Sequence, residues 1–158
     1  MRWFLVFCGV SLLLLLILLV WLRYGRISTP LRTGQIQIDG QVIEVEIADT
    51  ILSRERGLSG RDRLDKDHGM LFVFGMAAKH GFWMKDMKIP LDMIWIKGDA
   101  IVGITEQVYP DFKKSFWQLP IYYPPEAVDK VLEVPAGTVA LYSWRVGSVV
   151  LFPVSEVK

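Results

Sequence analysis

A run of 20 residues without a charge, residues 3–22, constrains this chain more than any other feature of its sequence. An α-helix needs about 20 apolar residues to cross the ~30 Å hydrocarbon core of a bilayer. Trp3 and Trp21 stand 18 positions apart, which is ~27 Å along a helix and places one indole at each membrane interface. We therefore expect a transmembrane anchor over residues 1–26.

The length of the run distinguishes an anchor from a cleaved signal peptide. The apolar region of a signal peptide spans ~7–15 residues and ends at a small-residue cleavage site. Residues 21–25, WLRYG, offer no such site, so we predict that the anchor is retained. The flanking charges leave its orientation nearly balanced, because Arg2 and the terminal amine oppose Arg23 and Arg26, and Arg32 adds only a slight bias toward a cytoplasmic domain.

The rest of the chain has the composition of a near-neutral globular domain. Residues 1–26 hold three arginines and no acidic residue, so the remainder carries 15 Lys and Arg against 17 Asp and Glu. This remainder is large enough for its own core and lacks the positive charge of a nucleic-acid-binding protein. The only cysteine, Cys8, lies in the apolar run, which leaves the domain without a disulfide, a thiol nucleophile or a cysteine zinc site.

Local patterns predict the first elements after the anchor. A proline and a glycine indicate a linker over residues 27–34, followed by a globular domain over residues 35–158. Apolar and polar residues alternate on both sides of Asp39-Gly40, a dipeptide typical of the type I′ turn of a β-hairpin. A short helix over residues 51–56, capped by Asp49 or Thr50, is expected to end at a glycine.

Short apolar segments predict the remaining strands. These segments are residues 69–74, 82–85, 91–96, 101–104, 131–134 and 148–152. Residues 138–144 are ambiguous between strand and helix, and four prolines oppose regular structure over most of residues 105–127. We predict a mainly β fold with minor α (α+β): a small barrel-like rolled sheet of about seven strands with one or two short helices, plus the N-terminal transmembrane helix.

Several segments carry a resemblance to a known family. They are ADT (48–50), RERGLSGRDRL (54–64), GMLFVF (69–74), FWMKDMKIPLDMIWI (82–96), VLEVPAG (131–137) and VGS (146–148). In this order they resemble the domain of unknown function 192 family over residues 36–152. The resemblance implies a compact β-rich, barrel-like domain, often behind an export signal or anchor, and hence an extracytoplasmic location. It implies no established activity.

The sequence departs from the family pattern in three places. Ser59 stands where a methionine is common, and Asp86-Met87 replaces a common Asn-Thr pair. Residues 107–127 differ from the frequent cysteine- and proline-rich stretch. A site that depends on this last segment is therefore in doubt for this chain.

Asp92 is the first candidate site residue, because it is the sole polar residue in the apolar segment 91–96. An unpaired buried carboxylate costs several kcal/mol, so Asp92 should have a partner. Lys85 is the nearest candidate, and Arg56 and Arg61 are others. A structural role, as a buried ion pair or with bonds to backbone N–H groups, is favoured, and a functional carboxylate in a pocket is the alternative.

Two further segments contribute candidates. Arginines in residues 54–63 suit anionic ligands, but they alternate with acidic residues as on an ordinary mixed surface. Among them we single out Arg56, which stands beside Gly57-Leu58 as in the family motif. The aromatic residues of the long segment 105–127 are expected either to contact a ligand or to fill the open end of the barrel. The candidate pocket consists of Arg56, Arg61, Trp83, Lys85, Asp92 and Trp117.

Function is less constrained than fold. Five of the six methionines lie within 24 residues, together with His68 and His80. Such ligands suit Cu(I), although core packing explains most of the methionines. Common catalytic motifs are absent, so no catalytic residue is assigned, and we expect no cofactor or metal. We predict a binding or interaction module whose partners are the bilayer, through residues 3–22, and an unidentified small ligand or protein, with no nucleic acid. The alternatives are a small enzyme using Lys85 and Asp92, or a methionine-rich copper-binding module.

Overall fold

The computed structural model of the protein describes residues 14–19 and 30–152. The chain divides into two compact units between Pro30 and Leu31. Residues 14–19 are helical, and the other residues of the predicted anchor lie outside the described part. Among the described residues, no helix combines the length and the apolar character that a membrane crossing requires. The membrane span over residues 3–22 therefore stays a prediction.

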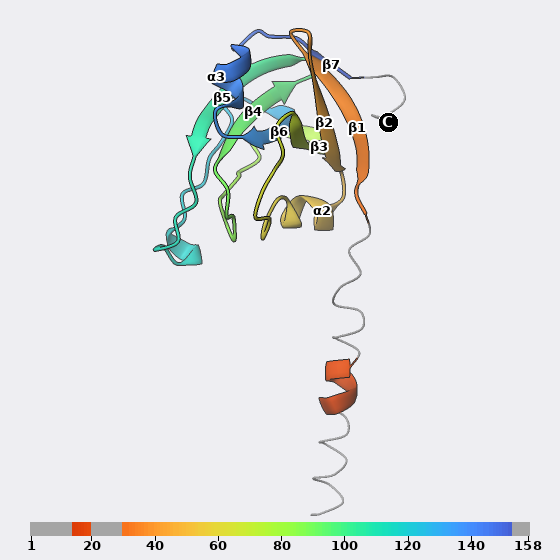
Figure 1. Cartoon of the computed structure of the whole chain (residues 1–158), viewed down its shortest axis with the longest axis vertical. Helices are drawn as coiled ribbons and strands as arrows, with labels where there is room; N and C mark the ends of the chain where they lie inside the picture. Colours follow the sequence, from red (N-terminus) through yellow and green to blue (C-terminus); the bar gives the residue numbers. More distant parts are fainter. Residues whose placement is uncertain (1–13, 20–29, 153–158) are drawn as a thin grey trace, which may run out of the picture. The chain divides into compact units, whose positions relative to one another are not determined.

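Within residues 30–152, seven strands form one sheet in the order β5-β4-β6-β3-β2-β1-β7 (Figure 1). Neighbouring strands are antiparallel except β2 and β3, which are parallel. Two short α-helices and one 3-10 helix accompany the sheet. The strands are β1 (Arg32–Ile38), β2 (Gln41–Ala48), β3 (His68–Ala78), β4 (Leu91–Lys97), β5 (Ala100–Val108), β6 (Val128–Pro135) and β7 (Val150–Leu151), and the helices are α2 (Ile51–Arg56), η1 (Phe116–Gln118) and α3 (Thr138–Tyr142).

The sheet curls into a half-barrel (Figure 1). At one end, the segment that leads into β7 joins the two edges of the sheet. The Gly147 N–H donates to the Ile101 carbonyl of β5 at 2.8 Å, and the Ile101 N–H donates to the Ser148 carbonyl at 3.0 Å. Val150 pairs with Ile38 of β1 at the opposite edge. The predicted rolled, barrel-like sheet is therefore confirmed.

Local sequence determines the first two turns of the domain. Asp39 and Gly40 both have positive φ, at 48° and 89°, as a type I′ turn requires. Thr50 caps α2 by a capping box, in which Thr50 Oγ1 accepts the Ser53 N–H and Ser53 Oγ accepts the Thr50 N–H. The helix spans the predicted residues and supplies the crossover that the parallel pair of β2 and β3 needs.

Some expected boundaries change in the structure. Residues 82–85 are not a strand, so this prediction is wrong: Phe82 forms a single bridge with Tyr122, and the rest of the segment belongs to an irregular loop over residues 79–90. The methionines on this loop turn toward the sheet instead of alternating along a strand. The ambiguous segment 138–144 contains the helix α3, and β1 begins inside the predicted linker at Arg32.

Both faces of the central strands are buried. Residues 91–96 of β4 and 130–134 of β6 are all buried, so the sheet carries a hydrophobic core on each face. The α3-side core includes Leu71, Ile94, Leu132 and Val139. The α2-side core lies beneath α2 and the loop 79–90, and it holds Leu58, Met70, Phe72, Met84, Met87, Met93 and Trp95.

Candidate functional site

A carboxyl group without a partner lies in the α2-side core. Glu133 is on the central strand β6, where Met70 of β3 and Met93 of β4 are its register neighbours. Its exposed fraction is 5%, and no described residue donates a hydrogen bond or forms an ion pair with its carboxyl group. Burial alone raises the pKa of Glu133 to about 8. At neutral pH this side chain is therefore mainly the uncharged acid.

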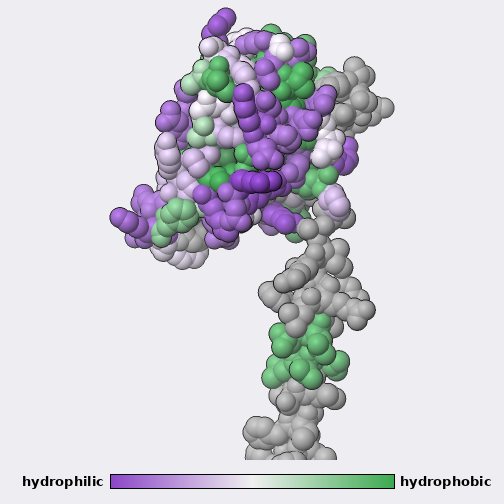
Figure 2. Space-filling view, in the orientation of Figure 1, coloured by the Kyte–Doolittle hydropathy of each residue, from purple (hydrophilic) through white to green (hydrophobic). Residues whose placement is uncertain are grey.

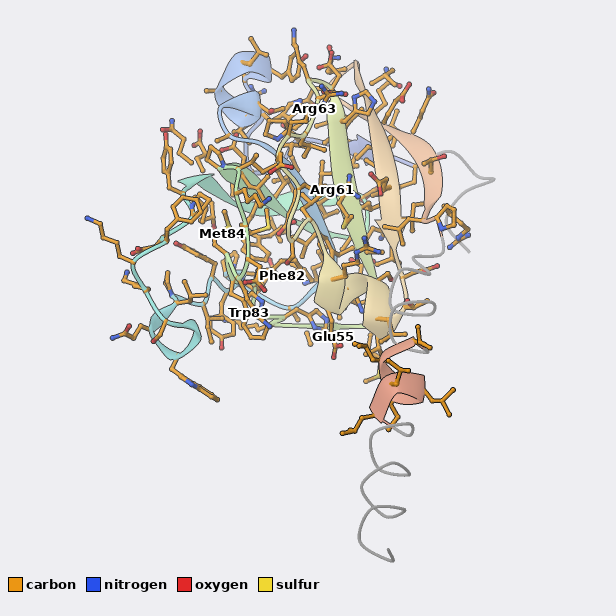
Figure 3. The ribbon with its side chains drawn as sticks, turned by 60° about the horizontal axis from the view of Figure 1, so that its bottom comes forward. Glu55, Arg61, Arg63, Phe82, Trp83 and Met84 are labelled. Carbon is orange, nitrogen blue, oxygen red and sulfur yellow. The ribbon has the colours of Figure 1, made fainter. Side chains whose placement is uncertain are left out.

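Glu133 lines a cavity of about 250 Å³, which we call the Glu133 cavity. α2 and the loop that follows it form one wall, β3 forms a second, and the loop 79–90 forms a third. Figure 3 shows Glu55 on α2 opposite the loop that carries Phe82 and Trp83. The rest of the lining is mainly apolar and aromatic, with Leu58, Phe72, Phe74, Phe82, Trp83 and Met87, and it also includes Ser59 and the His80 ring, which stacks on Phe74.

The aromatic walls are held in place by their own contacts. The Phe82 ring lies 4.9 Å from the Phe72 ring and 5.5 Å from the Trp95 ring, each in an edge-to-face arrangement. The Phe82 backbone exchanges two hydrogen bonds with Tyr122, at 2.9 and 2.7 Å. Edge-to-face pairs add about 0.5–1.5 kcal/mol beyond burial. The cavity is thus preformed and does not depend on an occupant for its shape.

Two arginines of α2, Arg54 and Arg56, lie at the mouth of the cavity and differ in their contacts. Arg54 Nη1 donates to the carbonyls of Asp49 and Val73, at 2.7 and 2.8 Å, and its guanidinium lies 5.1 Å from the centre of the Phe74 ring. These contacts fasten α2 to β3. Arg56 is exposed, and its guanidinium forms no hydrogen bond or ion pair with any residue in the described part of the chain. Arg56 is therefore free to meet an anionic group at the mouth.

The six residues predicted to share a pocket are distributed over the domain. Arg56 and Trp83 both line the Glu133 cavity. Arg61 lines a separate cavity of about 700 Å³ next to β2, and Lys85 lines a third one together with Phe112. Trp117 is 88% exposed. The sequence thus predicted one pocket for all six residues, and the structure brings only Arg56 and Trp83 together in the Glu133 cavity.

Arg61 is already engaged by a carboxylate. Its Nη1 and Nη2 donate to the two carboxylate oxygens of Glu46, at 2.5 and 2.6 Å. This bidentate hydrogen bonding holds the pKa of Glu46 below its usual value and raises the pKa of Arg61. Because both of its Nη atoms donate to Glu46, the Arg61 guanidinium is held against β2.

The predicted ion pair between Lys85 and Asp92 is wrong. Asp92 is fully buried and bonds backbone amides instead: Oδ1 accepts the Gln107 N–H at 2.8 Å, and Oδ2 accepts the N–H groups of Gly137 and Val139 at 2.9 and 3.0 Å. Lys85 is exposed. Asp92 therefore fixes β5 and the start of α3 to β4, which is the structural role that the sequence favoured.

Sequence reasoning missed Glu133, although the pattern that identified Asp92 was present there too. Glu133 is the only charged residue in the apolar run VLEVP, residues 131–135. The same argument on the cost of a buried carboxylate applies to it. A systematic search for lone carboxylates in apolar strands would have found both residues.

Most of the clustered methionines pack in the core. Met70, Met84, Met87 and Met93 belong to the α2-side core, and only Met76 of this group is exposed. Across the described residues, no three side chains among His, Cys, Asp and Glu are grouped to hold a metal ion. Packing thus accounts for the burial of these four methionines.

Comparisons with known proteins agree with this fold. A structure from Sinorhizobium meliloti 1021, described as a candidate transcription regulator, is similar with 30% identity and a TM-score of 0.71, over 79% of this chain and 97% of that one. A protein of unknown function from Novosphingobium aromaticivorans DSM 12444 has 23% identity and a TM-score of 0.71, over 80% and 90% of the two chains, and shows the fold alone. No curated protein matches. The model of the domain of unknown function 192 family (DUF192), described as an uncharacterized ACR, matches residues 34–152, and the chain belongs to this family.

Proposed function

We propose that this protein is a membrane-anchored binding module that takes a small organic amine into the Glu133 cavity. The observation that carries the proposal is the buried, unpartnered carboxyl group of Glu133 in the lining of an aromatic cavity. Buried polar groups in native proteins normally have hydrogen-bond partners, and an exception calls for an explanation. A ligand that supplies the missing partner is such an explanation.

The surroundings of Glu133 favour an amine over other ligands. Burial is the only influence that shifts its pKa, with no contribution from Arg54 or Arg56, the arginines at the cavity mouth. An ammonium group supplies a positive charge and three N–H donors. Phe72, Phe82 and Trp83 line the same cavity, and aromatic rings attract cations that lie over their faces. An anionic ligand would instead bring its negative charge next to the buried carboxyl group of Glu133, which offers no positive charge in return.

The cavity also limits the size of the ligand. Its volume of about 250 Å³ is below the ~300–1,000 Å³ of pockets for drug-sized molecules. A ligand with one ring or a short chain fits this description. A second, anionic group on the ligand is compatible with Arg56 at the mouth.

Benzylamine is the probe for this proposal, with benzyl alcohol and benzoate as matched neutral and anionic probes. The full-length protein in detergent micelles should show a higher melting temperature with benzylamine only, because a ligand of the folded state stabilises it. At neutral pH, the ammonium group should drive Glu133 to its carboxylate form. Titration calorimetry in two buffers of different ionisation enthalpy should therefore detect the release of up to one proton per ligand.

Glu133→Gln should abolish both the melting shift and the proton release. Glu55→Gln, at the exposed mouth of the same cavity, is the matched control and should retain them. Equal shifts with benzyl alcohol, or unchanged benzylamine binding by Glu133→Gln, would rule out the proposed site.

The anchor and the location of the domain form the second part of the proposal. The uncharged run over residues 3–22 supports a single-pass anchor without cleavage, and the family resemblance supports an extracytoplasmic domain. Mass spectrometry of the protein from the membrane fraction should find the intact N-terminus, whereas a start near residues 23–30 would contradict the anchor. A reporter that works only in the cytoplasm, fused after Lys158, should be inactive.

The competing functions receive less support. The enzyme hypothesis used Lys85 and Asp92, but Asp92 is sealed in the core and bonded to backbone amides. The copper hypothesis used methionines that pack in the α2-side core. The Sinorhizobium protein is described as a candidate transcription regulator, and a regulator that binds nucleic acid directly would require a positive surface. The near-neutral charge of residues 27–158 offers no such excess.

A further inference from the structure

Three segments form one end of the globular unit, which we call the aromatic end: α2 with residues 57–60, the loop 79–90 and residues 109–123. Ser59 Oγ donates to the Lys85 carbonyl at 3.0 Å and joins the first two segments. The backbone pairing of Phe82 with Tyr122 joins the second to the third. In Figure 1, α2 and η1 extend from the same side of the curled sheet.

Large apolar side chains are unusually exposed at the aromatic end. Its exposed aromatic residues are Trp83, Tyr109, Phe112, Trp117 and Tyr123. The exposed fractions of Phe112 and Trp117 reach 78% and 88%, and Ile51 and Leu52 of α2 are 68% and 78% exposed. Elsewhere in residues 30–152 none of the exposed large apolar residues is aromatic; they are Val42, Met76, Leu141, Val146, Val149 and Leu151. An exposed apolar cluster of this kind marks an interaction surface.

Positive charges accompany the exposed rings. Lys113 and Lys114 follow Phe112 directly, with Lys114 in an ion pair with Asp111 at 3.1 Å, and Lys79 is exposed on the neighbouring loop. Figure 2 shows strongly hydrophilic residues next to hydrophobic ones at the tip that contains η1. Aromatic residues beside lysines are typical of segments at a membrane interface, where rings insert at the headgroup level and lysines are attracted to anionic lipids.

The chain enters the globular unit at the aromatic end. β1 begins at Arg32, and the Arg32 guanidinium forms an ion pair with Asp49, the residue before the N-cap of α2. Only residues 23–31 separate Arg32 from the uncharged run. Nine residues reach at most about 30 Å when fully extended. An anchored domain therefore stays within this distance of the lipid surface.

We propose that the aromatic end docks on the surface of the bilayer in which residues 3–22 are anchored. This inference rests on the anchor of the proposed function. Ring insertion by Phe112 and Trp117, with lysines on anionic headgroups, would bring the mouth of the Glu133 cavity to the interface, because Trp83 belongs both to this end and to the cavity wall. Amphipathic amines, which concentrate in anionic membranes, would then reach the cavity along the membrane surface.

Site-specific fluorophores on the full-length protein test the docking. A nitrobenzoxadiazole label on Phe112→Cys or Tyr123→Cys, each with Cys8→Ser, reports the aromatic end, and Val146→Cys with Cys8→Ser reports a matched exposed site elsewhere on the domain. In vesicles of phosphatidylglycerol and phosphatidylcholine, nitroxide-bearing lipids should quench the labels at 112 and 123 several-fold more than the label at 146. Emission from 112 and 123 should also shift to the blue.

Flotation of the same vesicles distinguishes a failure of the docking proposal from a failure of the anchor proposal. If the protein floats and all three labels respond alike to nitroxide lipids, the anchor stands and the docking is refuted. If the protein does not float with the vesicles, the anchor is refuted and the docking with it. Benzylamine binding to Glu133 is measured in micelles and remains a separate test of the cavity.

Discussion

Replacing Glu133 with glutamine should stabilise the protein, and the gain should grow with pH. The carboxyl pKa rises from an ordinary value of 4.5 to about 8 on folding, because burial disfavours the charged form. Between these values the unfolded chain has lost a proton that the folded protein keeps. The free energy of unfolding therefore falls as pH rises through this window, is unaffected below it, and reaches its lowest level above it.

The size of the effect follows from the shift. A difference of about 3.5 pKa units corresponds to a full cost of about 5 kcal/mol, because one unit is 1.36 kcal/mol. Integrating the linkage relation from pH 5 to pH 8 gives a loss of about 3–4 kcal/mol for the wild type. Glutamine has the shape of the protonated acid and does not titrate, so Glu133→Gln should lack this loss and keep the packing against Met70 and Met93.

Urea denaturation followed by tryptophan fluorescence, at several pH values from 5 to 8, measures the difference. Trp95 is buried in the α2-side core and reports its unfolding. Glu55→Gln, an exposed carboxyl change at the same cavity, should follow the wild type at every pH. A stability difference between Glu133→Gln and the wild type that does not change with pH would refute the reasoning, since a buried acid with an unpaired carboxyl cannot give this result.

The remaining predictions concern the packing around the site and use the same denaturation assay. Asp92→Asn should destabilise the protein by about 2–4 kcal/mol, because one of three backbone N–H groups would face an amide NH₂. When Asp92→Asn is combined with Lys85→Met, the two changes in the free energy of unfolding should add. A coupling energy above about 0.5 kcal/mol would contradict this prediction and support an interaction between Lys85 and Asp92. Gly69→Ala should cost about 1–3 kcal/mol, because a Cβ there would lie 2.7 Å from the Glu133 carbonyl oxygen. Gly75→Ala has open space at the same strand and should be close to neutral.

Elements determined by neighbouring residues were predictable from the sequence. The Asp39-Gly40 turn supplies two residues at positive φ, and Thr50 with Ser53 caps α2 without help from the rest of the chain. The apolar run of β4 likewise needs only burial on both faces. In each case the decisive contacts lie within a few positions of one another.

Elements determined by distant residues were not predictable in this way. The segment 82–85 has the composition of a strand, yet only Phe82 finds a backbone partner, at Tyr122, and the bonds from Ser59 and Gly60 to residues 85 and 86 hold the rest as a loop. The parallel pairing of β2 with β3 depends on the crossover through α2. No local pattern distinguishes this pairing from an antiparallel one.

Asp92 and Glu133 show where the sequence stops informing about the site. Each is the only carboxylate in an otherwise apolar segment of its strand, and both are buried. The two strands, β4 and β6, are neighbours in the sheet. The donors that satisfy Asp92 come from residues 15, 45 and 47 positions later in the chain, on a turn of β5 and at the start of α3. The neighbours of Glu133 across both strands are methionines, whose side chains have no N–H or O–H to donate. The difference between the two carboxyl groups therefore lies in the donors that the fold brings to each: three backbone N–H groups reach Asp92, and no donor from the described residues reaches Glu133. Because both strands show the same apolar pattern around one acid, the sequence alone does not distinguish the two residues.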